Sequence, residues 1–216
     1  MTKKTKLKRT DIIVIVDRSG SMKDIWPEEI QGLNTFIEEQ KKLPGEAALT
    51  LVYFDGEIGT YYDRKRIDEV LPLTGYEFPP RGYTALLDTV GSVLFAHKAR
   101  TEKADQTMLV ITTDGYENAS HNYTAAQIKD MIKELETAGN FQTIYLGANQ
   151  DSWSVAKSLG INISNISNYD PTARGTLSKY AAVGASTMQF RSTGELKCSV
   201  QSLYDSAMAN NAVVSH

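Results

Sequence analysis

Residues 12–16 form the apolar run IIVIV, and the polar turn Asp17-Arg18-Ser19-Gly20-Ser21 follows it directly. The run is continuous rather than alternating, which is typical of a strand buried on both faces of a parallel sheet. The turn places one carboxylate and two hydroxyl groups at the end of this strand. The sequence therefore predicts a buried strand that ends in a candidate site for a hard cation.

Further strand patterns alternate with helical patterns along the chain. Strands are predicted at residues 49–54, 59–63, 108–112, 141–146 and 161–166. A first helix is predicted to begin near Pro27 and to end before Pro44-Gly45. A second is predicted to begin near Thr84, and a third at Thr124, where a capping box marks its start. Two more are predicted over residues 153–159 and 172–190. This alternation predicts a three-layer doubly wound α/β fold, with a central, mostly parallel sheet and helices on both faces.

The length of 216 residues and the hydrophobic content of 41% are enough for one sizeable core. We divide the chain into a basic N-terminal arm (residues 1–10), one domain (11–191) and a C-terminal tail (192–216). The arm holds five basic residues and is expected to be a solvated tail or the blunted start of an edge strand. The periodicity fades from about Ser192, so we expect a loosely packed tail there.

Charge and metal-binding residue types exclude several functions. A formal charge of -3 gives no overall field that would attract nucleic acid. The single cysteine, Cys198, and the scattered histidines His97, His121 and His216 do not have the spacing of zinc ligands. The apolar run behind the basic arm is too short for a signal peptide or a membrane span, so we expect a cytoplasmic protein with no membrane association.

A second acidic turn is expected close to the first. In open parallel sheets, ligands bind beyond the carboxyl ends of the strands, where the strand order reverses. Asp17 and Asp114 both follow such strands. If the two strands are neighbours, the two carboxylates converge with the hydroxyls of Ser19 and Ser21, and this oxygen-only set suits Mg²⁺, Mn²⁺ or Ca²⁺ rather than zinc.

Three segments resemble the von Willebrand factor A (vWA) family. Residues 17–21 are similar to the Asp-x-Ser-x-Ser signature of its metal-ion-dependent adhesion site, Thr84 is similar to the threonine at the start of a later helix, and Asp114 lies in a similar Thr-Asp-Gly turn. The order and coarse spacing of the segments also agree. The stretch at residues 145–151 resembles a segment of the soluble bacterial and phage branch of the family.

The resemblance implies a Rossmann-like vWA fold and a function. A divalent cation would be coordinated, directly or through water, by Asp17, Ser19, Ser21, Thr84 and Asp114, and its open position would bind an Asp or Glu carboxylate of a partner protein. Side chains that could shape the choice of partner or orient metal-bound water surround this set: Tyr83, Tyr116, Glu117, Asn118 and residues 149–151.

Other interpretations of the same residues remain open at this stage. Asp17 or Thr84 could cap a helix, and Asp114-Gly115 could be an ordinary turn. A Mg²⁺-dependent phosphoryl-transfer enzyme of the haloacid dehalogenase type also places an aspartate after its first strand, but it needs a second aspartate where this chain has Ser19. A metal could also stabilise the loops without binding a partner. We predict a binding module rather than an enzyme.

Overall fold

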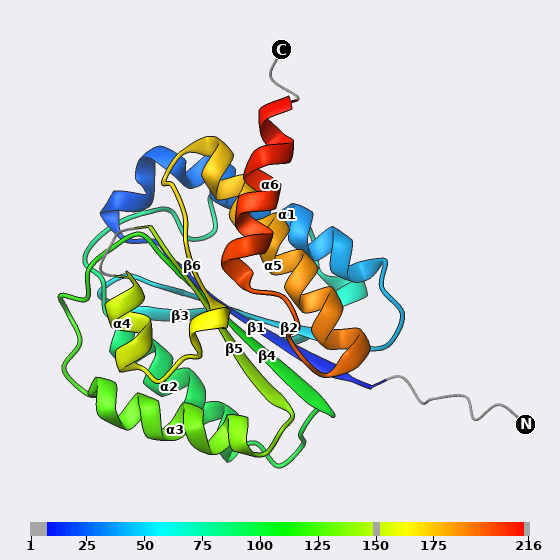
Figure 1. The fold of residues 1–216 in the computed structure, drawn as a ribbon. Coiled ribbons are helices and arrows are strands. Elements are labelled where there is room, and N and C mark those ends of the chain that lie inside the picture. Colours follow the sequence, from blue (N-terminus) through cyan, green and yellow to red (C-terminus); the bar gives the residue numbers. More distant parts are fainter. Residues whose placement is uncertain (1–7, 149–151, 214–216) are drawn as a thin grey trace, which may run out of the picture.

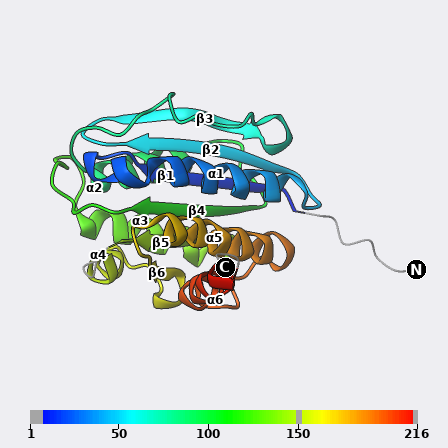
Figure 2. The same ribbon diagram turned by 90° about the horizontal axis from the view of Figure 1, so that it is seen from above.

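The computed structural model describes residues 8–148 and 152–213. Six strands form one sheet in the order β3-β2-β1-β4-β5-β6 (Figure 2). Their bounds are β1 Thr10–Asp17, β2 Ala47–Phe54, β3 Ile58–Arg66, β4 Gln106–Thr113, β5 Phe141–Gly147 and β6 Ile166–Asn168. The β2–β3 pair is antiparallel, and the other pairs are parallel.

Helices cover both faces of the sheet (Figure 1). One face packs against α1 (Trp26–Lys41), α5 (Ala173–Thr193) and α6 (Val200–Val213), and the other packs against α2 (Leu86–Ala99), α3 (Ala125–Thr137) and α4 (Ser152–Ser158). Three 3-10 helices complete the described elements: η1 Gly20–Ile25, η2 Ile67–Glu69 and η3 Ile163–Asn165. The three-layer α/β prediction is confirmed.

The strand order reverses at β1. The chain adds β2 and β3 on one side of β1 and then adds β4, β5 and β6 on the other side. Val16 of β1 is paired with Thr112 of β4, so the turns that follow the two strands lie side by side. All eight residues of each strand are buried, which explains their continuous apolar sequences.

Two local predictions are wrong in their details. Residues 161–166 do not form a strand, because the Asn162 side chain accepts a hydrogen bond from the Ser164 backbone at 3.0 Å and begins the 3-10 helix η3. The strand β6 begins only at Ile166. A 3-10 helix also follows the Asp17 turn, whereas the sequence predicts only a loop there.

The C-terminal segment is better ordered than the sequence pattern predicts. Residues 200–213 form α6, which packs against α5 and β6. Val200 and Tyr204 are buried in the core, and the Tyr204 hydroxyl accepts a hydrogen bond from the Asp170 backbone at 2.9 Å. Gln201 accepts a hydrogen bond from the Asn168 backbone of β6 at 2.8 Å. The expectation of a loosely packed tail is therefore wrong for α6.

The edge strand β3 is irregular. Its register with β2 shifts between Leu49 and Leu51 and again between Leu51 and Val52. Arg64 lies at this irregularity with a φ of 50°, a left-handed conformation that is unfavourable for a residue with a Cβ. Its backbone N–H donates to the side-chain hydroxyl of Thr50 on the neighbouring strand β2 at 3.1 Å. The pairing of β3 is thus interrupted in the middle of the strand.

The buried His97 of α2 should make stability depend on pH. Burial, with the positive charges of Lys103, Arg100 and Arg64, lowers the pKa of His97 to about 4. An unfolded histidine has a pKa of about 6.5. Between that pH and about pH 4, His97 is therefore protonated in the unfolded protein but mostly neutral in the folded protein, and this difference favours unfolding. We expect this group to remove about 2 kcal/mol from the free energy of unfolding between about pH 7.5 and pH 5.

Urea unfolding of the wild type and of His97→Phe at both pH values measures this contribution. The phenyl ring that this substitution introduces would keep the aromatic contact that His97 makes with Phe141, at 5.3 Å between ring centroids. The variant should lose less stability than the wild type on acidification, by about 2 kcal/mol. Equal losses in the two proteins would show that His97 titrates normally in the folded state.

Candidate metal centre

The first part of the site is the turn after β1. Asp17 is fully buried. Its Oδ1 accepts a hydrogen bond from the Ser19 backbone at 2.6 Å, and its Oδ2 accepts one from the Thr113 hydroxyl at 2.5 Å. Because both of these bonds hold the carboxylate beyond the strand end, Asp17 is fixed in position by its neighbours. Ser19 immediately precedes η1 but makes no side-chain cap bond to it, so the helix-cap interpretation of this turn is not supported.

Asp114 lies beside this turn, as the sequence predicts. The Ser21 hydroxyl donates to Asp114 Oδ1 at 2.7 Å, and the Ser19 and Ser21 hydroxyl oxygens are 3.1 Å apart. Asp114 follows β4 directly, and Asp17 ends β1. The strand ends therefore bring two carboxylates and two hydroxyls into one hydrogen-bonded group.

Thr84 lies in a separate loop that is hydrogen-bonded to the turn after β1 and to the segment after β4. Its backbone N–H donates to the Asn118 side chain at 2.9 Å, and its carbonyl accepts from the Asn118 backbone at 3.0 Å. On the other side, the Gly20 backbone donates to the Gly82 carbonyl at 3.3 Å. The helix α2 is capped at Ala85 with no side-chain bond, so Thr84 is not its cap. Its hydroxyl is left to face the site.

A second set of contacts holds the Thr84 loop against β1. The Arg81 backbone donates to the Arg18 carbonyl at 2.7 Å, and the Ala85 backbone donates to the Asp55 carbonyl at 2.9 Å. The Asp55 carboxylate lies 3.3 Å from the Arg18 guanidinium and 2.8 Å from that of Arg81. These bonds join three loops that are far apart in the sequence.

Gly115 shows where the oxygen atoms converge. A Cβ atom at this glycine would lie 2.8 Å from the Thr84 hydroxyl oxygen and 3.5 Å from both Asp17 Oδ2 and Ser19 Oγ. One point in space, at the backbone of the Asp114 turn, is therefore within reach of side-chain oxygens from the turn after β1 and from the Thr84 loop, and only a residue without a side chain leaves it open. The structure thus brings together all five residues that the sequence predicts: Asp17, Ser19, Ser21, Thr84 and Asp114.

The chemistry of this group fits a hard divalent cation. Burial raises the pKa of Asp17 to about 6, and burial also raises the pKa of Asp114, because water cannot solvate two neighbouring carboxylates there. A divalent cation would offset this cost. Among the described residues, no group of three or more His, Cys, Asp and Glu side chains is placed to hold a metal ion. The donors gathered here are two carboxylates and three hydroxyls, a combination that favours Mg²⁺, Mn²⁺ or Ca²⁺.

The rim of the site contains two kinds of residue. Tyr83 directly precedes Thr84 and is 71% exposed. Tyr116 lies two positions after Asp114 and is 60% exposed. Glu117 and Asn118 instead hold the loops, since Glu117 accepts hydrogen bonds from the Leu87 and Ser120 backbones at 2.8 and 2.7 Å. The two tyrosines are thus available to a partner, whereas Glu117 and Asn118 have structural roles. The predicted rim residues 149–151 lie outside the described residues.

A buried ion pair lies between α1, α5 and β4, next to the strand end that carries Asp114. The Lys179 ammonium of α5 donates to the Glu29 carboxylate of α1 at 2.6 Å, and both side chains are 0% exposed. Lys179 also donates to the Thr112 hydroxyl of β4 at 2.9 Å, and the Tyr180 hydroxyl donates to Glu29 at 2.7 Å. Burial raises the pKa of Asp114; the positive charge of Lys179 acts to lower it, and the negative charge of Glu29 acts to raise it. The two charges of the pair thus act on Asp114 in opposite directions.

Several of these supporting residues are not predictable from the motif. Thr113 and Gly115 belong to the Thr-Asp-Gly turn in which the sequence places Asp114, and Asn118 is expected at the rim rather than as a support of the Thr84 loop. Asp55 acts through contacts between loops, and the Glu29–Lys179 pair spans 150 positions of sequence. A lone lysine in a helix gives no signal of burial.

Several solved structures have a fold similar to that of this chain. The chain is similar to the vWF domain of the type V pilus tip protein Mfa5 from Porphyromonas gingivalis, with a TM-score of 0.61 and 12% identity over 89% of this chain and 99% of that chain. It is also similar to a von Willebrand factor type A protein from Catenulispora acidiphila (TM-score 0.56, 17% identity, 84% and 43% covered). A third similar structure is the mussel byssus protein PTMP1 with a zinc-occupied MIDAS motif (TM-score 0.53, 16% identity, 80% and 46% covered).

The fold is thus that of a vWA domain. The chain spans less than half of the PTMP1 and Catenulispora chains that it matches. No protein-family model and no curated protein matches the sequence. In the part of the chain that the structure describes, none of the helices combines the length and the hydropathy needed to cross a membrane.

Proposed function

We propose that this chain is a vWA module that binds a divalent cation and uses it to recognise an acidic group on a partner protein. The observation that carries the proposal is the convergence of side-chain oxygens from the turn after β1 and from the Thr84 loop around the point next to Gly115, with Asp114 of the third loop bonded to Ser21 beside it. Asp17, Ser19, Ser21, Thr84 and Asp114 would hold the cation, directly or through water.

The proposed ligand set leaves the cation able to attract a further anion. With two carboxylates and three hydroxyls, the site supplies two negative charges at most, so a divalent cation keeps its attraction for an incoming Asp or Glu. The exposed Tyr83 and Tyr116 rings would contact the partner beside that carboxylate. Similar structures include a PTMP1 form with a zinc-occupied MIDAS motif and the pilus adhesin SpaC, which supports both parts of the proposal.

Selection of peptides on the immobilised protein tests this function. A random peptide library is bound in Mg²⁺ and eluted with chelator, and each selected peptide is compared with its Asp→Asn or Glu→Gln counterpart. We expect selected peptides to contain an acidic residue whose amide counterpart binds at least about tenfold more weakly, a difference of about 1.4 kcal/mol.

The Asp114→Ala variant should select no such peptides, and Gly56→Ala, whose new methyl group meets nothing within 4 Å, should select them like the wild type. Peptides that stay bound in chelator, or that bind equally well as amides, would contradict carboxylate capture and favour a purely stabilising metal. Mg²⁺-dependent release of phosphate from a phosphomonoester would favour the enzyme alternative.

A further inference from the structure

Two exposed tyrosines border the proposed metal centre from adjoining segments of the chain. Tyr83 directly precedes Thr84, and Tyr116 lies two positions after Asp114. The Thr84 backbone N–H donates to the Asn118 side chain at 2.9 Å, and the Asn118 backbone N–H donates to the Thr84 carbonyl at 3.0 Å. These two bonds hold the segment of Tyr83 against the segment of Tyr116, so the two side chains leave the backbone beside the same site.

The backbone next to each tyrosine is fixed, although the side chains are exposed. The Gly82 carbonyl, before Tyr83, accepts a hydrogen bond from the Gly20 backbone at 3.3 Å. The Glu117 carboxylate, after Tyr116, accepts hydrogen bonds from three backbone N–H groups. A partner that contacts these rings therefore does not have to order the loops that carry them. Tyrosine is also enriched among the residues that contribute most to binding.

A hollow of about 330 Å³ adjoins Tyr83, and its charged groups balance one another. Arg81 donates to the Asp55 carboxylate at 2.8 Å and to the Glu57 carboxylate at 2.5 Å. The Arg18 guanidinium lies 3.3 Å from the same Asp55 carboxylate. Two positive and two negative charges thus offset each other, so the hollow selects neither an acid nor a base. The Tyr83 ring remains as the group that can hold an uncharged side chain there.

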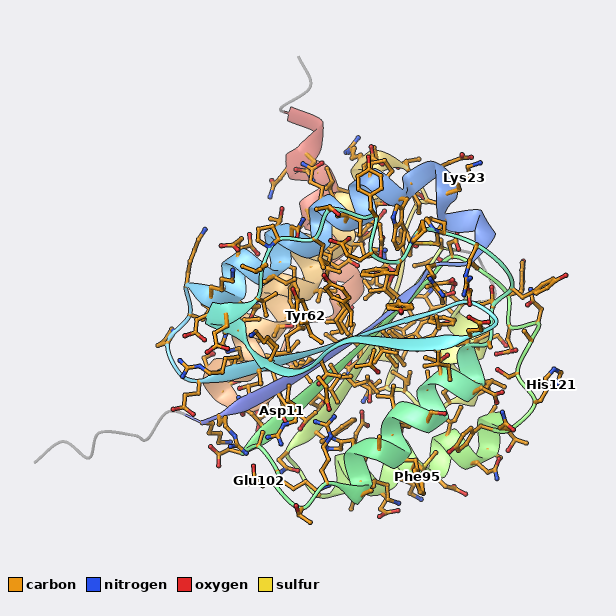
Figure 3. The ribbon with its side chains drawn as sticks, turned by 180° about the vertical axis from the view of Figure 1, so that it is seen from behind. Asp11, Lys23, Tyr62, Phe95, Glu102 and His121 are labelled. Atoms are coloured by element: carbon orange, nitrogen blue, oxygen red, sulfur yellow. The ribbon has the colours of Figure 1, made fainter. Side chains whose placement is uncertain are left out.

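A third exposed aromatic side chain, Phe95, lies outside this region. In Figure 3, Lys23 of η1 and His121 of the segment after β4 lie toward the end of the sheet where β1 and β4 finish, and Phe95 on α2 points away from the sheet. Because an α-helix rises 1.5 Å per residue, Phe95 is about 13 Å further along the axis than Leu86, where α2 begins. Phe95 is 64% exposed, so it is a matched control for the two tyrosines.

An extended peptide that directs a carboxylate to the point beside Gly115 would meet the tyrosines with particular neighbours of its acidic residue. Successive side chains of an extended chain point to opposite sides, so the residues directly before and after the acid point away from the protein. The residues two positions away point toward it, at about 6.5–7 Å from the acid along the chain. Tyr83 and Tyr116 are one and two residues from proposed ligands, which places them to contact these side chains.

We propose that the site selects an extended segment of its partner in which an Asp or Glu is accompanied, two positions before or after it, by an aromatic side chain that stacks on Tyr83 or Tyr116. An aromatic ring gains from stacking on tyrosine and carries no charge. An arginine also stacks on aromatic rings, but a divalent cation nearby would repel it. This inference rests on the proposed function and adds the chemistry of the partner segment to it.

Two isomeric peptides test the proposal. The first has a central aspartate with tryptophan two positions before and two positions after it, in a background of serine and glycine. Its isomer has the two tryptophans directly beside the aspartate, and a third peptide has serine in place of both tryptophans. Calorimetric titration of the wild-type protein in Mg²⁺ measures each affinity. We expect the first peptide to bind at least about tenfold more tightly than either of the other two.

Variants of the tyrosines locate this preference. The double variant Tyr83→Ser with Tyr116→Ser should reduce the advantage of the first peptide to about twofold or less, while the tryptophan-free peptide binds as before. Phe95→Ser should keep the full advantage, because it removes an exposed ring elsewhere on the protein. The increase in melting temperature on addition of Mg²⁺, measured for each variant, establishes that the fold and the metal centre are intact.

The outcomes separate this inference from the proposed function. Equal affinity of the two isomers, or an advantage that survives the loss of both tyrosines, would overturn the inference. The proposed function would then stand if the tryptophan-free peptide binds in Mg²⁺ and is released by chelator. If none of the peptides binds in a Mg²⁺-dependent way, or if asparagine replaces the aspartate without loss, the proposed function fails and the inference fails with it.

Discussion

Adding Mg²⁺ to chelator-treated protein should raise its melting temperature by about 5–10 °C, and replacing Gly115 with alanine should remove this increase. A cation at about 100 times its dissociation constant adds about 2.7 kcal/mol to the stability of a folded state that alone binds it. For a chain of this size, each kcal/mol corresponds to about 2–4 °C. The methyl group of Gly115→Ala would lie 2.8 Å from the Thr84 hydroxyl and 3.5 Å from Asp17 Oδ2, within the space for the cation.

Matched variants make this result specific. Gly56→Ala adds the same methyl group where nothing lies within 4 Å, so it should keep the full increase. Asp17→Ala should lose it, because it removes the buried carboxylate at the end of β1. Differential scanning calorimetry in chelator, Mg²⁺, Mn²⁺ and Ca²⁺ measures all four proteins. An increase of the same size in Asp17→Ala and wild type would place cation binding elsewhere on the protein.

Replacing Lys179 with methionine should be the most destabilising of the changes considered, at about 3–5 kcal/mol. The substitution leaves the Glu29 carboxylate buried with no positive charge beside it, and breaking a buried ion pair in this way costs about that much. Burial lowers the pKa of Lys179, and the charge of Glu29 opposes this effect. Urea unfolding of the metal-free protein measures the loss.

The double variant Glu29→Gln with Lys179→Met separates charge from packing. A glutamine amide can still accept the hydrogen bond that Tyr180 donates to Glu29 at 2.7 Å, and it carries no charge. We therefore expect the double variant to be more stable than Lys179→Met alone by at least about 1 kcal/mol, since the isolated charge is gone. A double variant no more stable than Lys179→Met, or a Lys179→Met variant within about 1 kcal/mol of the wild type, would show that the pair contributes little.

Much of the fold and the meeting of Asp17 and Asp114 could be predicted from sequence because both depend on local patterns, whereas Thr84 entered the ligand set only through the resemblance to the vWA family. A continuous apolar run marks a strand buried on both faces, and the polar turn after it marks the carboxyl end of that strand. Two such ends, at Asp17 and Asp114, identify the edge of the sheet at which ligands bind. Only the adjacency of β1 and β4 had to be assumed, and the register confirms it.

The remainder depends on contacts that no local pattern encodes. Asn118 holds the Thr84 backbone, and Lys179 reaches Glu29 across the core, yet each residue by itself resembles an ordinary polar side chain. The helix α6 is not predictable because its sequence is rich in small and polar residues, and Val200 and Tyr204 are the large side chains that it buries. Tertiary packing, rather than helical periodicity, determines that segment.

The irregular β3 strand and the α6 helix together limit how this protein can assemble with others. At one edge of the described sheet, the left-handed Arg64 interrupts β3 just before the charged pair Lys65 and Arg66. At the other edge, β6 is three residues long and is bonded to Gln201 of α6. Short, bulged or charged edges resist the addition of a foreign strand. We therefore expect this domain to stay unaggregated at high concentration and to meet its partners through loops and cavities rather than by extending its sheet.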